Sequence, residues 1–274
     1  MPPPEDWLLG NKETTTHLSG HKIPKTLRKV FLQKTAGFED FARMVPELKN
    51  AHSSWKEKNP DYLIEYFDLK LCREYLANYF HPIFLRAFDC IEAFAGKNNL
   101  FRMAVIYREG GWYSDWKQEC VKENLLNLLS NDTSYNTSKG LVVFKDKWSR
   151  DGAVQNGFFG ATARHPVIEE TLKMIFHNVQ SKDYPDNVFW TTGVGVFGMA
   201  LNFTIHKKLV NKSNIVLGRY TKKNVYWYKG KPIIDHKCKN CGKSQDWANG
   251  NNYKKLHAEN HYYCEDRQSL FQTI

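Results

Sequence analysis

Short apolar runs separated by longer mixed segments indicate strands that alternate with helices. The run IPKTLRKVFL, which begins at Ile23, predicts a first strand, and DYLIEYFD predicts a second. Between them, apolar residues at steps of three and four from Phe41 to Trp55 predict a helix with Pro46 near its start. Asn59-Pro60 closes that helix.

Further helices are predicted over residues 69–79, 82–94 and 98–109, with Gly110-Gly111 ending the last of them. Gly111 to Ser114, GLVVFKD and NGFFGAT read as strands, and helices are predicted over 166–179 and after TTGVG. This alternation predicts an α/β fold with a Rossmann-like, mixed but mostly parallel sheet flanked by helices. Ligands of such sheets bind at the carboxyl ends of strands, where YSDWK would lie.

A chain of 274 residues with 42% hydrophobic residues is long enough for one large domain. We expect a flexible, polar, Pro-rich arm over residues 1–20 and a single domain over 21–274, ending in a Cys- and His-containing segment from about residue 236. The formal net charge of +10 favours anionic partners such as phosphorylated small molecules. The basic residues are scattered, which argues against nucleic acid or a membrane surface as the partner.

No apolar window of about 18 residues predicts a membrane span, and the first residues lack the pattern of a signal peptide. We therefore expect a soluble, cytoplasmic protein. Cys238, Cys241 and Cys264, with His236, His257 or His261, form a candidate structural zinc site. Reduced cysteines without metal are the alternative for these residues.

The stretch REGGWYSDWKQEC holds the candidate chemistry. Asp115 follows the predicted strand, and Lys117 stands two positions later, where a metal-binding acidic pair would place its second carboxylate. A turn without function is the simplest alternative.

Five blocks in order resemble one enzyme family: IPKTLRKVF, SSWKEKNPDYLIEYFD, NNLFRMAVIYREGGWYSD, NGFFGATARHP and TTGVG. They resemble glycosyltransferases with a GT-A fold and a DXD motif, the family of the fungal initiating α-1,6-mannosyltransferase and of capsular polysaccharide enzymes, with glucosylating toxins as distant relatives. The resemblance covers about Ile23 to Asn202. It implies a GT-A domain that moves a sugar from a nucleotide-diphosphate sugar to a hydroxyl of a glycan acceptor.

The resemblance also implies roles for individual residues. Phe31 would stack on the nucleotide base, with a buried core aromatic as the alternative. Asn99, at a position where the family has Asp, and Arg102 share a helix face and would contact the donor sugar or its phosphates. Other residues expected at the donor are Tyr113, Asp115, Thr192, Gly193, His257 and His261.

The family's DXD acids bind Mn²⁺ or Mg²⁺, and Lys117 departs from that pattern. Lys117 would screen the leaving phosphate itself, so that no metal is required. Two alternatives stay open, namely a metal held by Asp115 with Glu119 and a site that has lost its activity. Thr192 is equally compatible with a helix cap, and Val194 replaces the family's proline in that loop.

Asp151 is the candidate base for an acceptor hydroxyl, although retention, which the family implies, needs no protein base. The reduced motif and the lack of an anchor resemble glycan-synthesis enzymes of large algal viruses, which act in the host cytoplasm. That resemblance favours a UDP-sugar donor, with UDP-xylose as a specific candidate. The alternatives from other classes are an inactive glycan-binding protein and a zinc-containing nucleic-acid-binding protein.

Overall fold

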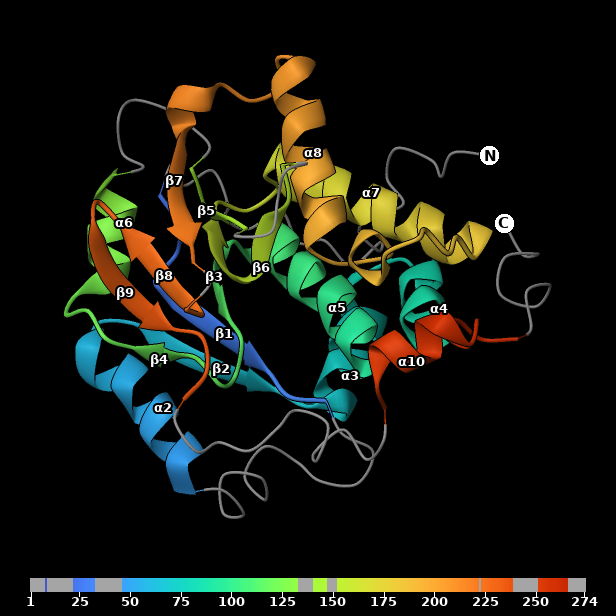
Figure 1. Ribbon diagram of the computed structural model, residues 1–274, viewed down its shortest axis with the longest axis horizontal. Helices are drawn as coiled ribbons and strands as arrows, with labels where there is room; N and C mark the ends of the chain where they lie inside the picture. The colour runs from blue at the N-terminus through green and yellow to red at the C-terminus, as the bar shows by residue number, and fades with distance from the viewer. Residues whose placement is uncertain are drawn as a thin grey trace.

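A mixed sheet forms the centre of the protein. The computed structural model describes residue 8 and residues 22–32, 46–132, 140–146, 152–221, 223–238 and 251–265. The strands in these residues are β1 (Thr26–Val30), β2 (Leu63–Phe67), β3 (Gly111–Ser114), β4 (Glu119–Cys120), β5 (Leu141–Lys145), β6 (Val154–Ala161), β7 (Ile215–Tyr220), β8 (Val225–Tyr228) and β9 (Lys231–Asp235). They form one sheet in the order β2-β1-β3-β6-β5-β7-β8-β9-β4 (Figure 1).

Helices cover both faces of this sheet (Figure 1). The described helices are α2 (Pro46–Lys58), α3 (Leu69–Tyr79), α4 (Pro82–Cys90), α5 (Phe94–Glu109), α6 (Leu125–Asp132), α7 (Pro166–Ser181), α8 (Val194–His206) and α10 (Tyr253–Ala258). The predicted α/β class is therefore confirmed. Proline stands at the first turn of α4 and of α7, and in each case the preceding histidine accepts a hydrogen bond from a backbone N–H of that turn.

The prediction of a mostly parallel sheet is wrong for the described strands. β1 pairs in parallel with β2 and β3, and β5 pairs in parallel with β7, but the other five pairings are antiparallel. The antiparallel character comes from β6, which runs against both of its neighbours, and from the meander β7-β8-β9. β4 follows β3 in the chain yet pairs with β9 at the end of the strand order, so the sheet curls back on itself.

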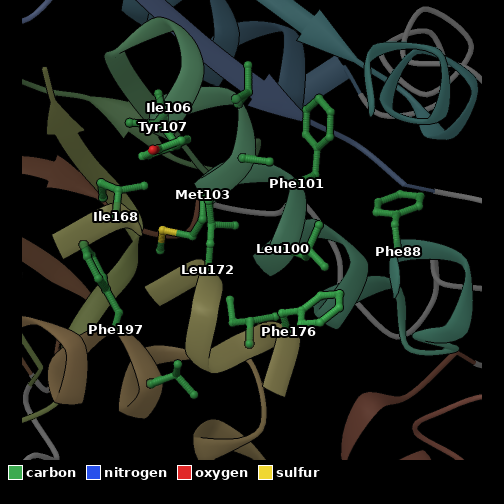
Figure 2. Packing of buried hydrophobic residues seen from close by; sticks show 14 of the residues in the cluster. Phe88, Leu100, Phe101, Met103, Ile106, Tyr107, Ile168, Leu172, Phe176 and Phe197 are labelled. Carbon is green, nitrogen blue, oxygen red and sulfur yellow. The ribbon is translucent and has the colours of Figure 1, made fainter. Parts of the chain in front are cut away.

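Alternation along the strands divides the interior into two cores. Trp112 and Phe158 point to one side of the sheet, where they join α2, α6 and the β8-β9 hairpin, while Tyr113 and Phe159 point to the other side. That second side holds the larger core, built with α3, α4, α5, α7 and α8. Figure 2 shows its centre, where side chains of α5 such as Met103 pack toward Leu172 of α7. These helices hold α5 firmly against the sheet.

Most predicted element boundaries hold. The helix expected over residues 82–94 ends at Cys90, because Ile91 forms a bridge with Tyr263, and α5 then begins at Phe94. The turn at Gly110 and Gly111 is confirmed, with φ of 66° and 96°. A Cβ at Gly110 would lie 2.7 Å from the backbone nitrogen of Ala163, so both conformation and space require glycine there.

The expected loose arm is described at one residue only. Leu8 is buried, with 3% of its surface exposed, and belongs to the larger core. Leu8 itself therefore packs against the domain, which the prediction of a flexible arm did not include.

Candidate functional site

Asp115 lies at the carboxyl end of β3, as predicted. Its backbone N–H donates to Gly157 O at 2.7 Å, which holds the residue against β6. Its side chain is 26% exposed, and Oδ1 accepts a hydrogen bond from the Tyr113 hydroxyl at 2.8 Å. Burial raises the pKa of the Tyr113 phenol well above its usual value, so this hydroxyl keeps its proton and remains a donor.

Arg102 reaches the same carboxylate from α5. Its Nη1 lies 3.2 Å from Asp115 Oδ1 and donates to Asn156 O at 2.6 Å, and the guanidinium carbon lies 4.3 Å from the centre of the Tyr113 ring. Only 6% of the Arg102 side chain is exposed. A buried guanidinium held beside a half-exposed carboxylate forms a fixed pair of opposite charges, one of which faces solvent.

A second row of polar side chains continues from Asn156. Its amide donates to Asn99 Oδ1 at 2.9 Å, and the Asn99 amide donates to Thr192 Oγ1 at 3.1 Å. Thr192 Oγ1 also lies 2.8 Å from the Tyr262 hydroxyl. The structure therefore brings together Asn99, Arg102 and Thr192, and their contact with a donor stays a prediction.

The alternative role of Thr192 as a helix cap is wrong. The cap of α8 is Gly193, and no side chain caps that helix start. The Thr192 hydroxyl faces Asn99 and Tyr262 instead, so it belongs to the polar row beside Asp115.

Two residues of this site were not predicted. A Cβ at Gly157 would lie 2.6 Å from Asp115 Oδ2, so only glycine leaves the carboxylate its place. Lys29 of β1 is buried, and its ammonium donates to Ser114 Oγ and to Asp115 O, each at 3.2 Å. The sequence signals for them were weak, namely a glycine inside the predicted strand NGFFGAT and a lysine inside the predicted first strand.

Lys117 and Phe31 both contact Trp116. The Lys117 ammonium lies 5.6 Å from the centre of the Trp116 ring, and the rings of Phe31 and Trp116 are 4.7 Å apart with a tilt of 58°. Phe31 is buried, so the structure shows the core aromatic that was the alternative to base stacking. Its role at a nucleotide base stays a prediction.

The Asp115 carboxylate offers few free ligand atoms for a divalent cation. Asp115 Oδ1 is already engaged by Arg102 and Tyr113, which leaves Oδ2 as the available oxygen of that carboxylate. In the described part of the chain, no three His, Cys, Asp or Glu side chains gather where they could hold a metal ion. One free carboxylate oxygen would hold a Mg²⁺ or Mn²⁺ ion only together with substrate phosphates and water, which is how Mg²⁺ is usually bound.

The zinc site predicted in the C-terminal segment is wrong for Cys238 and Cys264. Cys264 forms a disulfide with Cys90, 174 residues earlier, and Cys238 is disulfide-bonded as well. A sulfur in a disulfide is not a thiolate and does not ligate zinc. The alternative of reduced cysteines is wrong for the same residues, and Cys241 lies outside the described residues.

The two C-terminal histidines differ in their surroundings. His261 is exposed, whereas His257 lies against Tyr184 and Tyr262, with ring centres 5.4 and 6.2 Å away. Its Nε2 is buried and has no hydrogen-bond partner among the described residues. Neither histidine is shown to contact Asp115, and the candidate base Asp151 lies outside the described residues.

Comparison with known proteins assigns this region. Residues 46–135 match the family described as glycosyltransferase sugar-binding region containing DXD motif, a match that includes both Arg102 and Asp115. The protein is a glycosyltransferase. An uncharacterized glycosyltransferase of Acanthamoeba polyphaga mimivirus is 25% identical to it over 198 residues, which cover 72% of each chain.

Two solved structures resemble this protein at lower sequence identity. The PaToxG glycosyltransferase is 21% identical with a TM-score of 0.48, covering 70% of this chain and 72% of its own. The UDP-bound glycosyltransferase domain from the YGT toxin is 8% identical with a TM-score of 0.47, covering 72% of this chain and 80% of its own. None of the helices described for the glycosyltransferase combines the length and apolar character needed to cross a bilayer.

Proposed function

We propose that this glycosyltransferase moves a sugar from a nucleotide-diphosphate donor to a hydroxyl of a glycan acceptor, with a UDP-sugar such as UDP-xylose as the favoured donor. The proposal takes residues 21–274 as one transferase domain. The observation that carries it is the pair formed by buried Arg102 and half-exposed Asp115, 3.2 Å apart within the matched region. A carboxylate accepts hydrogen bonds from ribose or sugar hydroxyls, and a guanidinium suits phosphate oxygens.

The reaction breaks the bond between the sugar carbon and the diphosphate oxygen and forms a bond from that carbon to the acceptor oxygen. The nucleoside diphosphate leaves, and the acceptor hydroxyl gives up its proton. Negative charge grows on the leaving phosphate, so fixed cations beside it lower the barrier. We assign this role to Arg102, which is held in place by Asn156 and Tyr113, together with Lys117. In this proposal the two side-chain cations take the place of a metal ion.

Other residues complete the proposed donor and acceptor sides. Asn99 and Thr192 form the polar row next to Arg102 and would contact the donor sugar, with Gly193 beside them. Asp151 remains the candidate base for the acceptor hydroxyl. The net charge of +10 supports the proposal, because a positive field concentrates an anionic donor.

The test is calorimetric titration with UDP and with GDP, each in EDTA and in Mn²⁺. We expect UDP to bind in EDTA, and Lys117→Ala to weaken that binding about tenfold because a cation near the diphosphate is lost. Lys122→Ala, five residues further along the same segment, is the matched control and should bind like wild type. Transfer assays with a panel of UDP- and GDP-sugars then identify the donor.

Three results would contradict parts of this proposal. Binding that requires Mn²⁺ would show that a metal, not Lys117, neutralises the diphosphate. Tight GDP binding without UDP binding would overturn the donor assignment. No nucleotide binding together with glycan binding would show an inactive glycan-binding protein.

A further inference from the structure

Lys29 is buried in a way that the fold alone does not explain. Only 1% of its surface is exposed, and its ammonium lies 5.1 Å from the centre of the Trp55 ring. It forms no ion pair with any described carboxylate, and its acceptors are Ser114 Oγ and Asp115 O. A charge removed from water without an opposite partner destabilises the folded state.

A chain of hydrogen bonds leads from this ammonium across the interior. Ser114 Oγ donates to Gln118 Oε1 at 3.0 Å, and Gln118 Nε2 donates to the Tyr226 hydroxyl at 3.1 Å. Tyr226 donates to Gln155 Oε1 at 3.4 Å, and Gln155 Nε2 donates to the buried carboxylate of Asp146. Every donor in the chain points the same way, from the Lys29 cation toward the Asp146 anion, so the dipoles reinforce one another.

This chain passes beside the partly exposed carboxylate of Asp115. One point in space, the position of a Cβ on Gly157, lies 2.6 Å from Asp115 Oδ2, 3.0 Å from the Tyr226 hydroxyl and 3.1 Å from Gln118 Nε2. Lys29 also holds the main-chain oxygen of Asp115 itself. The main-chain oxygen of Asp115 thus accepts a hydrogen bond from the Lys29 cation, and its carboxylate lies beside the polar chain.

We propose that Lys29 is a positioning residue for sugar transfer: its buried ammonium fixes Asp115 through the main-chain oxygen and supplies a positive charge behind the nucleotide site. The inference rests on the proposed function, because Lys29 can affect sugar transfer only if an anionic nucleotide binds next to Asp115. Lys29 touches no reacting atom in this arrangement and acts through Asp115.

The groups around Lys29 make its charge adjustable near neutral pH. Burial lowers the pKa of Lys29 to about 7, while the negative charge of Asp115 on the β3 side opposes that shift. Burial holds the pKa of His52 in α2 at about 2 and raises that of Cys120 to about 11. Neither of these two side chains therefore changes charge between about pH 6 and about pH 8.5.

His236 is another ionisable side chain next to the hydrogen-bond chain, because its Nδ1 lies 3.0 Å from Gln118 Nε2. An effect of His236 on nucleotide binding is common to wild type and to a Lys29 variant. UDP itself also titrates near pH 6, equally for both proteins. The ratio of their dissociation constants at each pH therefore removes both contributions.

The experiment is titration of wild type and Lys29→Met with UDP by calorimetry, in EDTA, from about pH 6 to about pH 8.5. We expect Lys29→Met to bind UDP about tenfold more weakly than wild type at about pH 6. The ratio should fall toward one at about pH 8.5, where wild-type Lys29 has lost its proton. Lys97→Met, which removes another buried lysine, should show a ratio near one throughout.

Each outcome decides the matter. A ratio of one at every pH overturns the proposal, and a raised ratio that does not change with pH overturns the role of the charge. Wild type that binds no UDP at any pH defeats the proposed function itself and is distinct from both. If Lys29→Met does not fold, Lys29→Gln replaces it, since Gln keeps a hydrogen-bond donor without the charge.

Discussion

Lys29 beside Asp115 and Lys97 at the junction of α4 and α5 are both buried, but their surroundings differ. Lys97 donates to Phe88 O at 2.8 Å and to Asp89 O at 2.9 Å, and its ammonium lies 5.2 Å from the centre of the Phe88 ring. These carbonyls belong to the last turn of α4, where unpaired oxygens favour a cation. Lys97 therefore stabilises a helix end. Lys29 lies at no helix end and instead donates to Ser114 and Asp115 of the site.

The two regions are joined by the C-terminal segment. Cys90, the last residue of α4, is bonded to Cys264, and Ile91 pairs with Tyr263. Tyr262, next to this bridge, reaches Thr192 in the polar row of the site. The α4-α5 junction thus anchors a segment that contributes Tyr262 to the site, while the charges proposed to meet the donor lie near β3.

The largest expected effect separates the regions by charge. Asp115→Asn keeps the shape of the side chain but removes the carboxylate that Arg102 and Tyr113 hold, so sugar transfer should fall about 100-fold or more. The measurement is turnover of the donor identified by the panel assay. Asp89→Asn, at the α4-α5 junction, is the matched control and should retain turnover. Equal losses in both variants would show that the effect is on stability.

A pair of glycines in β6 gives the next largest effect. Gly157→Ala places a methyl group 2.6 Å from Asp115 Oδ2, so UDP binding should weaken about tenfold. Stability should fall as well, because the same methyl group lies 3.0 Å from the buried Tyr226 hydroxyl and 3.1 Å from Gln118 Nε2. Gly160→Ala places the methyl group 2.5 Å from the rigid Trp112 ring and should cost about 1–3 kcal/mol of stability without weakening UDP binding. Calorimetry and urea denaturation measure the two effects, and the reverse pattern would refute the placement of Gly157.

The surroundings of Asp115 could be predicted from the sequence only in part. Asp115, Arg102 and the strand Gly111–Ser114 were predictable because motif, helix and turn lie within one stretch of chain. Lys29 and Gly157 were not, because their roles depend on strand pairing. Register places Arg28 opposite Tyr113, and therefore Lys29 near Ser114, and it places Ser114 opposite Phe158.

The errors have the same physical origin. The excess of antiparallel pairings arises because β6 enters between β3 and β5, a choice among long-range partners that local periodicity does not encode. The zinc prediction grouped Cys238 with Cys264 by proximity in the chain. Cys264 is instead bonded to a residue 174 positions away, where the end of α4 approaches the C-terminal segment.

The smallest expected effect compares the two lysines through stability and pH. Burial lowers the pKa of Lys29 to about 7 and that of Lys97 to about 8, each from 10.5. Above the folded pKa and below the unfolded one, the unfolded chain binds more protons, so the free energy of unfolding rises with pH in that window. Lys29 contributes from about pH 7 upward, and Lys97 only from about pH 8.

Urea denaturation at intervals from about pH 7 to about pH 9.5 separates the two contributions. We expect Lys29→Met to remove a rise of about 1.4 kcal/mol per pH unit that begins near pH 7, and Lys97→Met to remove one of the same slope that begins near pH 8. Above about pH 10 the buried phenols of Tyr113 and Tyr226, whose pKa values burial raises, act in the opposite direction, which sets the upper limit of the scan. A rise from pH 7 that survives in Lys29→Met would show that Lys29 is not the group that titrates there, and the distinction between the two buried lysines would then rest on their hydrogen bonds alone.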